Sequence, residues 1–145
     1  MQVYLAAPFF SDEQISRVSS LEQALENNPT VNDYYSPRQH QTTDAPQFSA
    51  AWAAEVFQRD VTQVRKADVI VTVADYRDND ADSGTAFEQG MAYVLETPIV
   101  MFEETDYQTN LMLTESLTTF ISDPSELAQL DFHALPNQPF SGKRL

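Results

Sequence analysis

Cysteine is absent from this chain of 145 residues, which excludes disulfides, thiolate catalysis and cysteine-based zinc sites. Glycine is also scarce, with three residues in total. The sequence has no G-x-G-x-x-G fingerprint and no P-loop, so it offers none of the usual dinucleotide or triphosphate motifs. A G-x-S-x-G nucleophile elbow is missing too. The two histidines, His40 and His133, have no metal or triad spacing and are expected at the surface or in the tail.

Basic residues are few, with eight Lys and Arg against 22 Asp and Glu and a net charge of -14. Polyanions bind proteins mainly through Lys and Arg side chains that displace counterions. We therefore expect neither a nucleic-acid polymer nor an anionic membrane as a partner. A neutral small molecule meets no such electrostatic barrier.

Long hydrophobic runs are missing as well, since no segment approaches the roughly 20 apolar residues that cross a bilayer. The segment 1–5 leads directly into a strand pattern, without a basic leader or a cleavage site. We therefore expect no signal peptide and a cytoplasmic location. The length fits one domain, so residues 1–145 are predicted to form a single unit.

Strand patterns and helix patterns alternate along the chain. Strands are predicted at 2–7, 33–36, 68–74, 97–102 and 118–122. Helices are predicted at 12–27, 48–66, 85–95 and 124–130. The rest is expected as loops at 37–47 and 75–84 and an irregular tail at 131–145. This alternation predicts an α/β fold, a flavodoxin-like or Rossmann-like three-layer sandwich with a mainly parallel five-stranded sheet.

Such folds bind ligands at the carboxyl ends of their strands. One segment in such a position, DSGTAFEQG at 82–90, contains two of the three glycines. Gly84 allows a tight turn or a close approach of the backbone to a ligand. Gly90 falls inside a predicted helix at a cost of about 1 kcal/mol relative to alanine, which suggests close packing or a nearby ligand.

Glu88 has two interpretations on spacing alone. Thr85 and Glu88 match a capping box, in which the glutamate bonds back to the threonine backbone. Alternatively, Glu88 is an ionised carboxylate that attacks an anomeric carbon, as retaining glycosyl transfer requires. Asp60 and Asp82 are candidates to assist such a reaction, although each also fits a solvent-exposed charge. The pattern leaves both interpretations open.

A calcium loop is not expected, although Asp78, Asp80 and Asp82 alternate as in one. Its sixth position would be Ser83 in place of glycine, and its twelfth would be Gln89 in place of glutamate. We predict no metal site.

Aromatic residues lie near the end of the first predicted strand. Phe9 and Phe10 follow that strand directly, where they would suit the floor of a pocket for a planar ring. Trp52 fits the core or a pocket wall.

Five segments occur in a distinctive order from the first strand almost to the end of the chain. They are YLAAPFF at 4–10, Trp52 with FQRD at 57–60, ADVIV at 67–71, DSGTAFEQG at 82–90 and NLM at 110–112. The pattern D-x-G-x-x-x-E-x-G is the most specific of them. Together they resemble the nucleoside 2-deoxyribosyltransferase family.

The resemblance implies a role for each matching residue. Glu88 falls on the family's nucleophile, and Tyr4 falls on the tyrosine that orients it. Asp60 and Asp82 fall on the aspartates that handle the base and the sugar hydroxyls and assist protonation of the leaving group. The implied substrate-binding residues are Ala6, Phe10, Gln39, Gln41, Trp52, Gly84, Asn110 and Met112.

The resemblance also implies the reaction and its partners. Glu88 would displace the base of a 2'-deoxyribonucleoside, and a second free nucleobase would then attack the covalent intermediate with overall retention. No metal or organic cofactor is needed. A homo-oligomer, from dimer to hexamer, is implied, with Asn110 and Met112 reaching a neighbouring site.

Two features depart from the family pattern. Ala6 stands where glycine is frequent, and the chain ends in Leu145 where many members end in a tyrosine whose carboxylate completes a site. Two alternatives stay open. One is a 2'-deoxynucleoside (5'-phosphate) N-glycosidase that uses water, although the first loop offers a phosphate little. The other is a non-catalytic nucleotide-sensing or interaction domain on the same scaffold.

Overall fold

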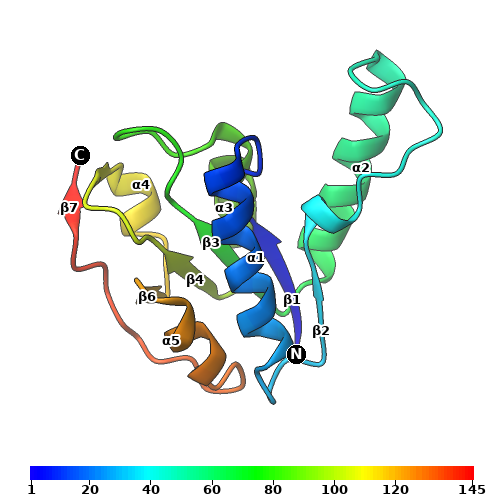
Figure 1. The fold of residues 1–145 in the computed structure, drawn as a ribbon. Helices are drawn as coiled ribbons and strands as arrows, with labels where there is room; N and C mark the ends of the chain where they lie inside the picture. Colours follow the sequence, from blue (N-terminus) through cyan, green and yellow to red (C-terminus); the bar gives the residue numbers. More distant parts are fainter.

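A five-stranded parallel sheet lies at the centre of the computed structural model, which describes residues 1–145 (Figure 1). Its strands are β1 (Gln2–Ala6), β2 (Asp33–Tyr35), β3 (Val69–Val73), β4 (Ile99–Phe102) and β6 (Thr119–Ile121). They are ordered β2-β1-β3-β4-β6, and every neighbouring pair is parallel. This is the flavodoxin-like strand order. The predicted α/β sandwich with a mainly parallel five-stranded sheet is confirmed.

Helices cover both faces of this sheet. They are α1 (Asp12–Glu26), α2 (Ala50–Lys66), α3 (Ser83–Val94), α4 (Leu111–Thr114) and α5 (Pro124–Gln129), with a 3-10 helix at Pro37–Gln39. Side chains alternate between the faces along each strand. Val3 and Leu5 on β1 therefore join a core cluster with α1 and α5, whereas Tyr4 and Ala6 join a cluster with α2 and α3. Glu88, on α3, is thus on the face of the sheet to which Tyr4 points.

Helix α2 stands out because its only buried residue is Val64, near its carboxyl end. Figure 1 shows its first half, with the loop before it, extending past the carboxyl ends of the strands. The prediction began this helix at residue 48. Phe48 instead has a φ of 67°, in the left-handed region that a right-handed helix excludes, and Ser49 caps the helix through its side chain.

The predicted irregular tail contains more structure than its sequence indicates. Lys143–Arg144 forms β7, which pairs in parallel with β5 (Gln108–Thr109). Phe132 and Phe140 are buried against the body of the protein. Two-residue strands are too short to show a hydrophobic period, which explains why the pattern missed them.

None of the helices combines the length and the apolar character that spanning a bilayer requires.

Candidate active site

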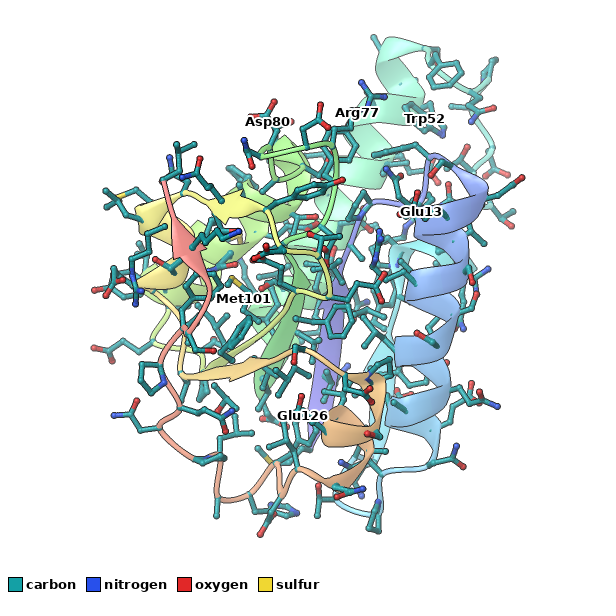
Figure 2. All side chains as sticks on the ribbon, turned by 60° about the vertical axis from the view of Figure 1, so that its left-hand side comes forward. Glu13, Trp52, Arg77, Asp80, Met101 and Glu126 are labelled. Carbon is teal, nitrogen blue, oxygen red and sulfur yellow. The ribbon has the colours of Figure 1, made fainter.

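A cavity of about 390 Å³ lies beside the carboxyl end of β1 and the start of α3. It is lined by Ala7, Phe9, Phe10, Pro37, Gln41, Gln47, Phe48, Trp52, Val56, Asp60, Asp82, Gly84, Thr85 and Glu88. Figure 2 shows Trp52 and the loop that carries Arg77 and Asp80 at the same end of the molecule. This is the edge of the sheet at which α/β folds bind ligands.

Glu88 is held in this cavity by a tyrosine from the sheet. The Tyr4 hydroxyl donates to Glu88 Oε1 at 2.5 Å, and the Tyr4 side chain is completely buried. The capping-box interpretation of Glu88 is wrong, because α3 begins at Ser83 and its N-cap is Asp82. Glu88 therefore lies in the second turn of α3, where its side chain meets the sheet instead of its own helix end.

The environment of Glu88 favours the protonated form. Burial raises the pKa of its carboxyl from 4.5 to about 7, and the negative charges of Asp60 and Asp82 add to the effect. The hydrogen bond from Tyr4 acts in the opposite direction, since it stabilises the carboxylate. Burial, with the same carboxylate, raises the pKa of Tyr4 far above its usual value, so Tyr4 stays a donor.

Asp60, on α2, is mostly shielded from solvent, with a side chain that is 17% exposed. Its Oδ1 accepts a hydrogen bond from the Tyr35 hydroxyl at 3.2 Å and lies 3.7 Å from Arg59 Nε. Burial raises the pKa of Asp60, against the lowering effects of Arg59 and Tyr35. Asp60 is therefore not the solvent-exposed charge that its helical position also allowed.

Asp82 has a structural role as well as a place in the cavity. Its Oδ2 accepts hydrogen bonds from the Thr85 backbone N–H at 2.9 Å and from the Thr85 hydroxyl at 3.2 Å. A Cβ on Gly84 would lie 3.0 Å from the same oxygen, so glycine lets the cap close tightly. The loop carboxylate is thereby fixed at the positive end of α3.

The other substrate-binding residues implied by the resemblance fall into two groups. Phe10, Gln41, Trp52 and Gly84 line the cavity with Glu88. The structure does not bring the remaining four into it. Ala6 is fully buried in the sheet, and Gln39 donates instead to the Tyr34 hydroxyl.

Asn110 and Met112 line a separate cavity of about 510 Å³ between α3 and α4. Asn110 caps α4 through a hydrogen bond from the Met112 backbone N–H, and Met112 is 72% exposed. Gly90 borders this cavity, and a Cβ there would meet nothing within 4 Å. The close packing expected around Gly90 is therefore not found within the chain.

Sequence patterns missed several cavity residues. Gln47 and Phe48 lie in or beside the segment predicted as a polar loop, and Phe48 packs edge-on against Trp52 with ring centroids 5.3 Å apart. Phe48 could have been found from the sequence, because an aromatic residue beside a polar loop often contacts a ligand. Tyr35 gave no signal, because its link to Asp60 depends on tertiary structure.

No group of three or more His, Asp or Glu side chains is arranged to hold a metal ion. What the cavity offers is a held carboxylate of near-neutral pKa, two further aspartates and aromatic walls. Negative groups in a partly desolvated site stabilise a developing positive charge such as that of an oxocarbenium-like transition state. The arrangement suits displacement at an anomeric carbon.

Comparisons with known proteins agree with this geometry. The family model described as nucleoside 2-deoxyribosyltransferase matches residues 3–128. A nucleoside deoxyribosyltransferase of Limosilactobacillus fermentum is 32% identical, with 96% of this chain and 90% of that protein covered. The structure of a 2-deoxyribosyltransferase from Bacillus psychrosaccharolyticus is 34% identical with a TM-score of 0.85, and covers 97% of this chain and 100% of its own.

A 2-deoxyribosyltransferase from Leishmania mexicana shares the fold at 19% identity and a TM-score of 0.68, with 92% of this chain and 99% of that chain covered.

Proposed function

This chain belongs to the nucleoside 2-deoxyribosyltransferase family, and on that premise we propose that Glu88 is the nucleophile of its base exchange. The enzyme transfers the deoxyribosyl group of a 2'-deoxyribonucleoside from one nucleobase to another. The single observation that carries the proposal is the 2.5 Å hydrogen bond from buried Tyr4 to Glu88 Oε1 at the wall of the cavity. It engages one carboxylate oxygen, while Oε2 accepts no hydrogen bond from the chain.

In the first step, Glu88 Oε2 forms a bond to C1' while the bond from C1' to the base nitrogen breaks. The electron pair of that bond leaves with the base, which takes up a proton. Asp60 is the proposed proton donor, because it lines the same cavity as Glu88 and burial raises the pKa of its carboxyl. In the second step, a nitrogen of a free base attacks C1' from the opposite face, the bond from C1' to Glu88 Oε2 breaks, and the proton displaced from that nitrogen passes to the ionised Asp60. Two inversions retain the β-configuration.

The aromatic walls support a planar base as the ligand. Phe9 and Phe10 stack with centroids 5.4 Å apart, and Trp52 and Phe48 line the same cavity. Aromatic side chains stack on flat rings, so these walls suit a planar heterocycle. Gln41, which also lines the cavity, supplies an amide for the edge of the base.

The test is base exchange between deoxyinosine and adenine, followed by chromatography. We expect the wild type to form deoxyadenosine and Glu88→Gln to form none while staying folded. Glu55→Gln removes the same charge from an exposed position on α2 and should exchange bases like the wild type. Undiminished exchange by Glu88→Gln would refute the nucleophile assignment. Free base and sugar alone from the wild type would identify a hydrolase.

We further propose that the enzyme is a homo-oligomer in which Asn110 and Met112 complete the site of a neighbouring subunit. Within one chain they lie away from the cavity of Glu88. The surface around them is apolar, since Leu111, Met112 and Tyr93 are all more than half exposed.

A complementation experiment tests shared sites. Glu88→Gln and Asn110→Ala should each be inactive or weak alone. After subunit exchange, a mixed oligomer contains a site with an intact glutamate and an intact neighbouring asparagine. Activity should therefore return in the mixture. A mixture no more active than its parts, or a monomer in sedimentation velocity, would refute this proposal.

A further inference from the structure

Two tyrosines lie side by side on neighbouring strands below the cavity. Tyr4 on β1 and Tyr35 on β2 are register partners in the parallel ladder, so their side chains point to the same face of the sheet. Their rings stack with centroids 5.7 Å apart and an interplanar angle of 14°. Each hydroxyl reaches a different carboxylate of the site. Tyr4 donates to Glu88, and Tyr35 donates to Asp60.

We propose that Tyr35 is a positioning residue that fixes the rotamer of Asp60 and leaves the acidic proton of Asp60 on Oδ2. This inference rests on the proposed function, in which Asp60 protonates the departing base. The Tyr35 hydroxyl occupies Oδ1 at 3.2 Å, and Arg59 Nε lies 3.7 Å from the same oxygen. An oxygen that accepts one hydrogen bond and faces a guanidinium is a poor site for the carboxyl proton, so the proton resides on the other oxygen.

The rigidity of Tyr35 supports this role. His40 stacks on the outer face of its ring, with centroids 4.2 Å apart, and Tyr4 packs on the inner face. The His40 ring is itself tied to the Ser36 carbonyl through Nδ1 at 3.0 Å. Packing of two rings against the phenol restricts its rotation, which fixes the direction in which its hydroxyl donates to Asp60.

The charged and titratable groups that face Asp60 come from five segments, of which the first is β1 with Tyr4. The others are Tyr35 on β2, His40 after the 3-10 helix, Arg59 on α2 and Glu88 on α3. The Tyr35 hydrogen bond favours ionised Asp60. Its loss therefore moves the pKa of Asp60 upward, which separates a positioning role from a merely structural one.

The experiment compares Tyr35→Phe with Tyr34→Phe. Both variants lose one hydroxyl that donates to a carboxylate, but the Tyr34 partner is Glu26, on α1 and away from the cavity. Tyr35→Phe should lower kcat about fivefold, the usual net effect of losing one hydrogen bond to a neutral group, with little change in KM. The alkaline limb of its kcat profile, on which Asp60 loses its proton, should move to higher pH. Tyr34→Phe should change neither, and both variants should show wild-type circular dichroism.

Tyr35→Phe with the kcat and pH profile of Tyr34→Phe would overturn the inference. So would a lower kcat with an unmoved pH profile, because that result indicates a structural effect alone. If Glu88→Gln also proved fully active, that result would refute the proposed function itself. An inactive Glu88→Gln beside an unaffected Tyr35→Phe would overturn only the role of Tyr35.

Discussion

Replacing Glu88 by glutamine should abolish base exchange and make the protein more stable at alkaline pH. The carboxyl has a pKa of about 7 in the fold, against 4.5 for the ordinary group. Because the folded-state pKa is raised, folding favours protonated Glu88. The contribution of Glu88 to the free energy of unfolding is therefore most favourable below pH 4.5. It weakens as the pH rises and is lost above pH 7.

The size of the effect follows from that difference in pKa. Each pKa unit corresponds to about 1.4 kcal/mol, so ionised Glu88 costs at most about 3 kcal/mol at pH 8. Glutamine keeps the shape and an oxygen that accepts from Tyr4, but it carries no charge. The variant should therefore be up to about 3 kcal/mol more stable than the wild type at pH 8, and about equally stable at pH 4.

Urea denaturation at pH 4, 6 and 8, followed by circular dichroism, measures this difference. Glu55→Gln serves as the control for net charge, because a chain of charge -14 gains some stability from losing any negative charge. The gain of Glu88→Gln over Glu55→Gln should grow with pH between 4 and 8. A gain that is independent of pH, or a variant less stable than the control at pH 8, would refute the electrostatic reasoning.

Three further changes have defined outcomes. Tyr4→Phe removes the bond that lowers the pKa of Glu88, so the acid limb of kcat/KM should move to higher pH and kcat should fall at least tenfold. Arg17→Met removes a buried guanidinium that donates to Glu104 at 2.6 Å and to Glu13 at 2.9 Å, and urea denaturation should show a loss of about 2 kcal/mol. Gly90→Ala should raise the stability of the isolated chain by about 1 kcal/mol, since the added methyl group meets nothing; unchanged or lower stability would point to unseen packing.

The sheet was accessible to sequence reasoning because its signals are local. Strands β3 and β4 are fully buried, and their sequences are apolar except for Thr72. Ser11, a residue type that favours the N-cap, stands directly before α1, and its side chain accepts from the Gln14 backbone N–H. The ends of the helices were harder to predict. The start of α2 depended on one left-handed residue, Phe48, which no propensity predicts.

The site was only partly accessible, because its contacts join distant segments. The bond between Tyr4 and Glu88 spans 84 positions, and spacing near Thr85 favoured a cap that the structure does not have. Family resemblance, not periodicity, singled out the glutamate. Tyr35 was missed because its contact with Asp60 depends on the register of two strands and the path of α2.

The residues around the cavity divide by origin. Tyr4, Asp60 and Glu88 belong to regular elements, whereas Gln41 and Gln47 come from the irregular stretch between the 3-10 helix and α2. That stretch carries none of the acidic groups assigned to bond making and breaking. Grafting residues 41–48 from a relative should therefore alter which heterocycles are accepted and leave the reaction mechanism unchanged. This loop is thus the natural target for redesigning the enzyme towards unusual nucleosides.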